Sequence, residues 1–375
     1  MQDGQHFGWI DIAKAAAIVL IVAFHTTDWF LYAVLPDASD AGVTFWREVN
    51  SALIPVRIPL FFLVSGILAT RAIERPWRSI IEGRFLVLLW PFFIWTALVA
   101  PFWAYRVSYD EPTALAPTAL ATLAFGGAHY WYLPALVVAI ALARLTRRIR
   151  VPTLVVAAVL AFGGKAMFAP LLAPLGSVFA TNIDRWLTFT FWFLLGCFAR
   201  PALLAIARWP VWAGIATVGV FGGLTLLQRT IGVLPITTTA LTITGMLAAV
   251  ILSRWASRSE AVERLGHYLA RRTLPIYLGH ALLFEALAVA AEAIRRNGMQ
   301  LPAALVPSGL LAVPLIVIVA VAVSAGLYDS SRRAHFGWLY EPPQWLRAAI
   351  AVLPGSAPPG HSQPSSRGRP AAAPE

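Results

Sequence analysis

The chain has 375 residues, of which 59% are hydrophobic and only 13% are charged, and its mean hydropathy is +0.71. Soluble domains carry about 25% charged residues, so this composition excludes a soluble globular protein and predicts an integral membrane protein. The net charge of +11 invites a nucleic-acid interpretation, but the distribution of the arginines, given below, argues against it. Cys197 is the single cysteine, so the sequence excludes an intrachain disulfide and a cysteine-based metal site.

The first apolar stretch, residues 9–30, carries three titratable side chains: Asp11, Lys14 and His25. At ~1.5 Å per helical residue, Lys14 and His25 are separated by roughly 16 Å along the axis. Their spacing is close to three helical turns, so both side chains lie on one face. Charge inside hydrocarbon is costly, and this face is therefore expected to meet protein or a water-filled cavity.

Ten stretches are long and apolar enough to cross a bilayer as helices, which predicts an all-α, polytopic membrane helix bundle. If the N-terminus is cytoplasmic, 20 of the 29 basic residues fall in inner segments and 7 in outer segments, with Lys14 and Arg57 inside helices. This asymmetry follows the positive-inside rule and predicts that both termini are cytoplasmic. The ten stretches are residues 9–30, 52–70, 85–104, 130–146, 151–169, 186–205, 210–228, 233–252, 273–293 and 307–328.

The composition divides the chain into three parts. Residues 1–328 form the predicted membrane domain. Residues 329–353 combine aromatic and basic side chains, which is typical of an interfacial or cytoplasmic segment. Residues 354–375 consist mainly of Pro, Ser, Gly and Ala, and we predict a disordered tail.

The second apolar helix contains the run Val56-Arg57-Ile58-Pro59-Leu60-Phe61-Phe62-Leu63-Val64-Ser65-Gly66. An arginine within a membrane helix indicates a functional site, and Arg57 is expected at a depth similar to that of His25. The small pair Ser65-Gly66 predicts close helix packing in preference to a serine nucleophile.

Four features together resemble the acyltransferase-3 family of polytopic membrane O-acyltransferases, in particular its fucose-O-acetylase-like branch. They are a Lys followed after ten residues by a His in the first helix, the Pro-Leu-Phe-Phe-x-x-Ser-Gly segment, the aromatic run at residues 128–136, and the later motifs at 191–196 and 275–280. The resemblance covers about residues 8–328. One departure is Arg57-Ile58-Pro59, where members of that branch often have His-Met-Pro, so the acceptor sugar need not be the same.

The resemblance implies transfer of an acyl group, most often acetyl, from cytoplasmic acetyl-CoA or another acyl-CoA to a hydroxyl of a glycan or related acceptor. The expected location is a bacterial inner membrane, as a multi-pass protein of the lipid bilayer. The expected partners are the acyl-CoA and a carbohydrate or glycolipid acceptor, without nucleic acid and without a metal.

The resemblance also suggests roles for particular residues. His25 is the predicted catalytic base, since an imidazole is suited to deprotonating a hydroxyl near neutral pH. A covalent relay through acyl-His25 stays open. Arg57 is expected to stabilise the developing oxyanion or to clamp the acceptor. Lys14 and His280 are assigned to the donor site, where Lys14 would contact phosphates or amides of the acyl-CoA. A structural hydrogen bond is the alternative for His280.

Three residues are predicted on the acceptor side. Asp28 follows His25 by one turn and is either an orienting acid or an interfacial one. Tyr130 and Trp131 form either an aromatic belt at the outer interface or the floor of a sugar cleft.

A transporter or flippase is the alternative function, in which Lys14, Arg57, His280 and Glu285 would be coupling or substrate residues. Transporter halves usually repeat internally, and this sequence shows no such repeat. A scaffold without chemistry would leave the buried charges unexplained. Glu285 requires a partner that the sequence does not identify, and Lys165 and Asp184 are expected to flank an outer loop.

Overall fold

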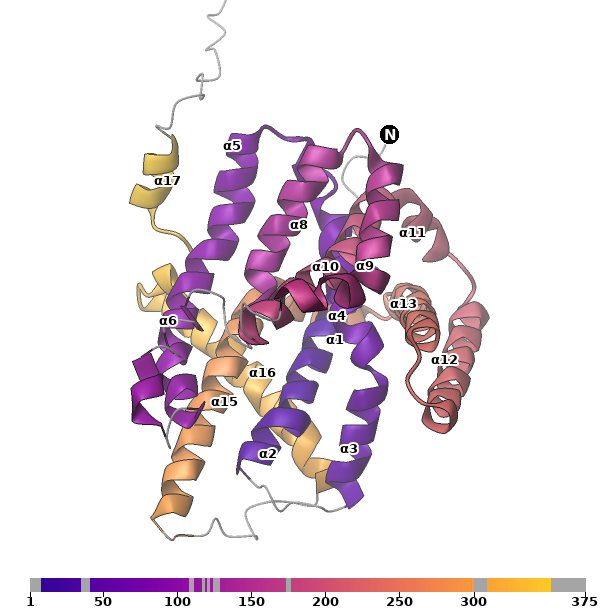
Figure 1. The fold of residues 1–375 in the computed structure, drawn as a ribbon. Coiled ribbons are helices and arrows are strands. Elements are labelled where there is room, and N and C mark those ends of the chain that lie inside the picture. Colours follow the sequence, from indigo (N-terminus) through magenta and orange to yellow (C-terminus); the bar gives the residue numbers. More distant parts are fainter. Residues whose placement is uncertain are drawn as a thin grey trace, which may run out of the picture.

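The computed structural model describes residues 8–34, 41–107, 111–116, 119, 122–123, 129–172, 177–297, 299 and 309–351. These residues form helices and connecting turns, without a strand among them, so the predicted all-α class is confirmed. The helices pack side by side in one bundle (Figure 1), with α5 and α17 at one end and α2 and α3 at the other.

The N-terminal half begins with a nearly continuous helix from Gly8 to Val34. Within it, a π-helical turn at Thr26–Phe30 joins α1 to α2. A second π-helical turn, Ile81–Phe85, joins α5 to α6. The helices of this half are α1 (Gly8–His25), α2 (Leu31–Val34), α3 (Ala41–Ala52), α4 (Ile54–Ala69), α5 (Trp77–Ile80), α6 (Leu86–Val107), α8 (Tyr132–Thr146) and α9 (Arg150–Leu172).

The C-terminal half follows the same pattern of long apolar helices joined by short turns. Gly232, at φ 85°, ends α12, and Pro235 begins α13 at a position where proline is favoured. The helices are α10 (Ser177–Phe198), α11 (Arg200–Ile206), α12 (Val211–Ile231), α13 (Pro235–Ala256), α14 (Glu260–Arg271), α15 (Thr273–Arg296), α16 (Gly309–Arg333) and α17 (Gln344–Ala351).

In the described part of the chain, six helical segments are long and apolar enough to cross a membrane, or up to eight if each of two bent pairs counts as one span. The bent pairs are α3 with α4, at 51°, and the α10 segment Ala180–Phe198 with α11, at 81°. Helices α8 and the apolar part of α9 are shorter than the length required. The chain is therefore a multi-pass helical membrane protein, whereas ten spans and cytoplasmic termini stay predictions.

The structure differs from the sequence-based expectations in three places. Helix α10 begins at Ser177, so Asp184 lies within a helix and not beside a loop. Lys165 likewise lies within α9. Helix α14 was not predicted, because its polar residues resemble a basic inner loop; it packs along α1, where Ile12 contacts Gly266.

The centre of the bundle is the crossing of α4 with α10. Gly66 of α4 lies against the backbone of Phe193, and Gly196 of α10 lies against the backbone of Leu63. A Cβ on either glycine would come within about 2.1 Å of a carbonyl oxygen, so only glycine allows this approach. The close helix packing predicted around Ser65-Gly66 is thus present.

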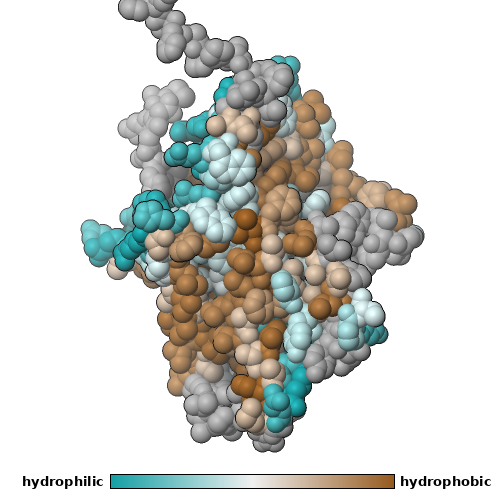
Figure 2. Space-filling view, turned by 90° about the vertical axis from the view of Figure 1, so that its left-hand side faces the viewer, coloured by the Kyte–Doolittle hydropathy of each residue, from teal (hydrophilic) through white to brown (hydrophobic). Residues whose placement is uncertain are grey.

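The outer surface matches a bilayer environment. Figure 2 shows hydrophobic side chains across the middle of one face, with hydrophilic ones gathered above and below.

After α16, the chain returns to the bundle: the indole of Trp95 in α6 donates to the carbonyl of Leu339 at 2.8 Å, and Tyr340 is buried beside it. Helix α16 continues to Arg333, past the predicted boundary at residue 328.

Candidate active site

The end of α1 is a break in regular helical geometry directly after His25. The following π-helical turn begins with Thr26 and Thr27, whose hydroxyls donate back to carbonyls of the preceding turn. Thr26 bonds the carbonyl of Val22 at 2.9 Å. Such hydroxyls satisfy carbonyls that a widened turn leaves without an amide partner. Single π-helical turns are frequent at functional sites, and here the turn begins next to the predicted base.

His25 is paired with His280, which lies 255 residues further along the chain on α15. Nδ1 of His25 is 2.9 Å from Nε2 of His280, and the rings are stacked with centroids 5.1 Å apart. Nδ1 of His280 is 2.8 Å from the carbonyl oxygen of Ile276. A carbonyl only accepts, so Nδ1 of His280 carries a proton and, in the neutral ring, its Nε2 is the acceptor.

This chain of bonds defines the tautomer of His25. Since Nε2 of His280 accepts, Nδ1 of His25 donates, and Nε2 of His25 retains its lone pair. His280 is completely buried, so water does not compete for this bond. The pair therefore holds a basic imidazole nitrogen in a defined orientation.

Arg57 approaches the same region from α4. Its side chain is 5% exposed, and Nη1 donates to the carbonyl oxygen of Asn50 at 3.1 Å. Its guanidinium carbon lies 3.6 Å above the ring centre of Phe24, the residue before His25. Among the described residues, no carboxylate forms a salt bridge with Arg57. A buried guanidinium without such a partner retains positive charge that can stabilise a developing anion.

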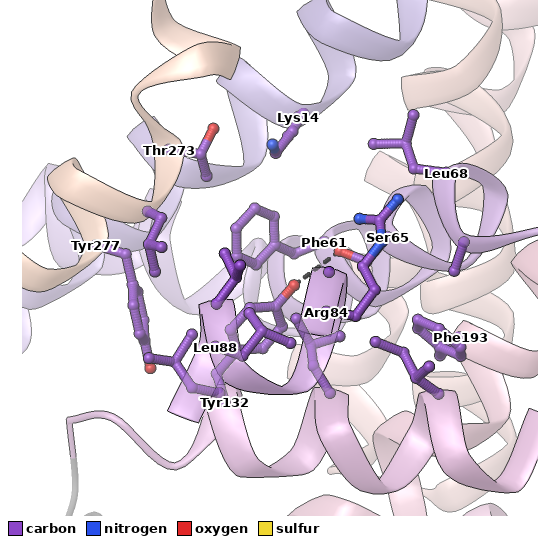
Figure 3. A pocket seen from close by; sticks show the side chains of 17 residues that line it. Lys14, Phe61, Ser65, Leu68, Arg84, Leu88, Tyr132, Phe193, Thr273 and Tyr277 are labelled. Atoms are coloured by element: carbon purple, nitrogen blue, oxygen red, sulfur yellow. Dashed lines mark hydrogen bonds between the residues drawn. The ribbon is translucent and has the colours of Figure 1, made fainter. Parts of the chain in front are cut away.

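A pocket of about 750 Å³, including its opening to solvent, is lined by residues of α1, α4, α8 and α15 and of the turn that leads into α6. Figure 3 shows Lys14 and Arg84 at this cavity, together with the hydrogen-bonded pair Ser65 and Tyr132. Ser65 Oγ and the Tyr132 hydroxyl are 2.8 Å apart. Most other lining groups are apolar, so this is an apolar pocket with positive charge at Lys14 and Arg84. His25 and Arg57 are not among the residues that line it.

Lys14 is fixed by a hydrogen bond from Nζ to the carbonyl oxygen of Ala270 at 3.1 Å, next to Thr273, which donates to the same carbonyl at 2.9 Å. Asp11, one turn before Lys14 on α1, lies with Oδ2 2.9 Å from Nδ1 of His267 in α14. Arg84 belongs to the second π-helical turn and was not predicted from the sequence as a site residue. Lys14 thus lines the cavity as a donor-site cation would.

Glu285 has two partners that could not be named from the sequence. This carboxylate is completely buried; Oε1 lies 2.9 Å from Nε2 of His129, and Oε2 lies 3.1 Å from Nη1 of Arg106. The ring of His129 meets the ring of His25 edge-on, with centroids 6.5 Å apart. No periodicity in the sequence links these residues, because His129 precedes α8 and lies outside any helix.

Residues 7–329 match the acyltransferase domain of the acyltransferase-3 family. This match spans most of the chain. The chain belongs to the acyltransferase-3 family. This membership agrees with the resemblance carried by the Lys14–His25 spacing and the Pro59–Gly66 segment, and the chain is a multi-pass helical membrane protein of that family.

One curated relative of this chain is the inner membrane protein YcfT of Escherichia coli (strain K12), with 31% identity over 86 residues. The matched segment covers 22% of this chain and 24% of YcfT. No solved structure matches the chain.

The predicted acceptor-side residues differ in their exposure and in their partners. Asp28 is exposed and accepts a hydrogen bond from Thr27 at 2.8 Å, while the Nδ1 partner of His25 is His280. Tyr130 is completely buried, and its hydroxyl donates to the carbonyl of Leu278, so its ring offers no free face for a sugar. Trp131 is 7% exposed and stacks beneath the guanidinium of Arg185, at 5.0 Å.

Proposed function

We propose that this protein transfers an acyl group, in the simplest case acetyl, from cytoplasmic acyl-CoA to a hydroxyl of a glycan or related acceptor. We place it in a bacterial inner membrane, in agreement with the location in the name of its relative YcfT. The observation that carries the proposal is the His25–His280 pair, which leaves Nε2 of His25 free to accept a proton.

In the proposed reaction, Nε2 of His25 takes the proton of the acceptor hydroxyl, and the oxygen attacks the thioester carbonyl carbon. Negative charge develops on the carbonyl oxygen, and Arg57 is the cation that stabilises it. The carbon–sulfur bond then breaks and CoA leaves as the thiolate, while His25 holds the proton that it removed. His280 acts through His25 as a positioning residue, in the way that a carboxylate orients histidine in hydrolytic triads.

The cavity at Lys14 and Arg84 is the proposed donor site. Coenzyme A carries several phosphate oxygens, and two cations in an otherwise apolar pocket are suited to bind them. Lys14 and His25 lie on one helix, roughly 16 Å apart along its axis, so a long donor can span from cation to base. In this proposal His280 belongs with the base, in place of the donor-site role predicted from sequence.

The test is release of CoA thiol in membranes that contain the wild-type chain or His25→Ala, supplied with acetyl-CoA and envelope glycans. Transfer is followed separately as labelled acetate on the glycan fraction. We expect turnover in wild type and a loss of at least about 100-fold in His25→Ala. His267→Ala, which changes an exposed histidine of α14, is the matched control and is expected to keep wild-type turnover.

Equal turnover in wild type and His25→Ala would remove His25 from the mechanism. Uptake of a glycan-linked substrate without acylation would support the transporter alternative. A rapid-quench experiment distinguishes direct attack from a relay, since only the relay accumulates acyl-His25.

A further inference from the structure

A third imidazole, that of His129, lies next to the His25–His280 pair and has no role in the mechanism above. His129 is 6% exposed, and its ring lies 5.1 Å from the ring of Trp29 and 6.5 Å from that of His25. Its position is fixed from two sides. Nε2 contacts Glu285, and its backbone carbonyl accepts a hydrogen bond from the Tyr277 hydroxyl.

The imidazoles of His25 and His129 differ in their hydrogen-bond partners. His25 is backed by His280, a neutral ring whose second nitrogen is held by a backbone carbonyl. His129 is backed by the carboxylate of Glu285 at 2.9 Å. An anion at hydrogen-bond distance stabilises an imidazolium, whereas a neutral ring supplies no charge. Where the surroundings separate two titratable groups in this way, one is suited to act as acid and the other as base.

The hydrogen bonds also define which atoms face the reaction. A carboxylate accepts, so Nε2 of His129 carries its proton toward Glu285 and Nδ1 is the remaining nitrogen. No partner in the described part of the chain bonds Nδ1. In the imidazolium this nitrogen carries a second proton, which is available for transfer.

We propose that His129, held as an imidazolium by Glu285, is the proton donor of the acyl transfer, while His25 is its base. The inference rests on the proposed function. His25 Nε2 removes the hydroxyl proton as the new carbon–oxygen bond forms. As the carbon–sulfur bond breaks, Nδ1–H of His129 gives its proton to the departing thiolate sulfur, and the products are an ester and CoA thiol. The proton on His25 then passes to His129, whose ring adjoins it, and both return to their initial states.

Arg106 weakens the interaction between the Glu285 carboxylate and His129. Its guanidinium bonds the second oxygen of Glu285 at 3.1 Å and lies 5.3 Å from the ring centre of Trp29. By sharing the carboxylate, Arg106 weakens its hold on the His129 proton. An imidazolium paired with a fully available buried carboxylate would hold its proton too tightly to release it.

Among the described residues, the titratable and charged groups that face His129 come from three helices and from its own segment. Helix α15 supplies Glu285, His280 and the Tyr277 hydroxyl, α6 supplies Arg106, and α1 supplies His25. The neighbour from its own segment is the ring of Tyr130, at 6.3 Å. Glu285 is the only anion in this set, so it alone stabilises charge on His129.

The first test reads protonation without turnover, by ¹⁵N NMR of histidine-labelled protein in detergent at pH 7, with assignment by His25→Gln and His129→Gln. We expect a doubly protonated His129 and a neutral His25 protonated at Nδ1. A neutral His129 at pH 7 would overturn the proposal, whether or not the proposed acyl transfer is observed. Absence of CoA release by wild type would contradict the proposed function instead, and the two failures are thus distinguishable.

The second test compares pH profiles of kcat. A proton donor must stay protonated, so it sets the alkaline limb, and Glu285→Gln is expected to move that limb about one unit to lower pH with about a tenfold loss at pH 7.5. Arg106→Gln frees the carboxylate for His129 and is expected to move the limb in the opposite direction. Glu292→Gln, on the same helix but paired with the arginines 295 and 296, is the matched control and should leave the profile unchanged.

Opposite shifts from two substitutions in one ion pair are not a result of general destabilisation, which lowers kcat without moving a limb. An alkaline limb at the same pH in Glu285→Gln and Glu292→Gln would overturn the inference. Shifts in the same direction for Glu285→Gln and Arg106→Gln would also overturn it.

Discussion

Helices α15 and α12 have similar lengths and both are apolar enough to span a membrane, yet they place polar groups in opposite ways. The apolar window of α15 is 61% buried and includes His280 and Glu285, both completely enclosed by protein. The window of α12 is 6% buried, and its single charged residue, Arg229, is exposed and pairs with Glu48. Hydropathy alone does not distinguish the two helices.

The comparison identifies the polar residues whose burial is energetically unfavourable and is explained by a function. Burial of a polar or charged group is unfavourable by several kcal/mol unless partners replace its water. On α15 each such group has a specific partner from another helix or from the segment before α8. On α12 the charge remains at the surface, where its contribution to stability is small. Most of the predictions below compare a substitution within the bundle with a matched substitution at the surface.

The largest contrast is expected between Arg57→Met and Arg229→Met. The first removes the buried cation next to Phe24, and kcat should fall about 100-fold with a smaller change in KM for acyl-CoA. The second removes an exposed ion pair and should leave kcat within about twofold. Steady-state CoA release measures both. Comparable losses in the two variants would show that the arginines act through folding.

Next comes the packing contrast between Gly66→Ala and Gly222→Ala. A Cβ at residue 66 would meet the carbonyl oxygen of Phe193 at 2.0 Å, so we expect a loss of about 2 kcal/mol in the free energy of unfolding. At residue 222 a Cβ meets nothing within 4 Å, and alanine is expected to be neutral or stabilising by up to about 1 kcal/mol. Unfolding in mixed micelles tests the pair. Equal stabilities would contradict the close crossing of α4 and α10.

A smaller effect is expected when His280 loses its acceptor nitrogen. In His280→Leu, His25 has no fixed tautomer, and kcat should fall about tenfold while KM for acyl-CoA is unchanged. His280→Gln retains an acceptor oxygen and should recover part of the loss. A purely structural role for His280 predicts that both variants lose stability and activity together, without rescue by glutamine.

The smallest effect is expected in the donor cavity. Lys14→Met removes one of two cations there, and KM for acyl-CoA should rise about fivefold with little change in kcat. Arg78→Met is the control, because this arginine is exposed and paired with Glu82. A rise in KM that is equal in both variants would assign the effect to the general positive charge of this end of the molecule.

The sequence was sufficient for those parts of the fold and site that lie within single helices. Apolar length predicted a helix at each of the ten stretches, and the spacing of Lys14 and His25 predicted one shared face. The buried arginine of α4 was identified because charge within an apolar run is rare. The number of spans was harder to predict, since bends at residues 53 and 199 depend on tertiary packing and not on hydropathy.

The parts that the sequence did not predict join distant segments. His25 meets His280 across 255 positions, and Glu285 meets His129 across 156, so no local pattern reports either contact. Helix α14 was missed because its charged face resembles a loop, although its glycine at 266 allows close packing on α1. Tyr130 and Trp131 resembled interfacial aromatics, yet their neighbours in the bundle enclose them.

The π-helical turn after His25 has a consequence for how this helix can change in length. Such a turn holds one residue more than an α-helical turn, and its greater width absorbs that residue. A one-residue deletion within Thr26–Phe30 would therefore restore an α-helical turn, while residues 8–25 and 31–34 keep the faces that they present to the bundle. Changes in length at this point are a route by which related chains could reshape the region beside the histidine without displacing it.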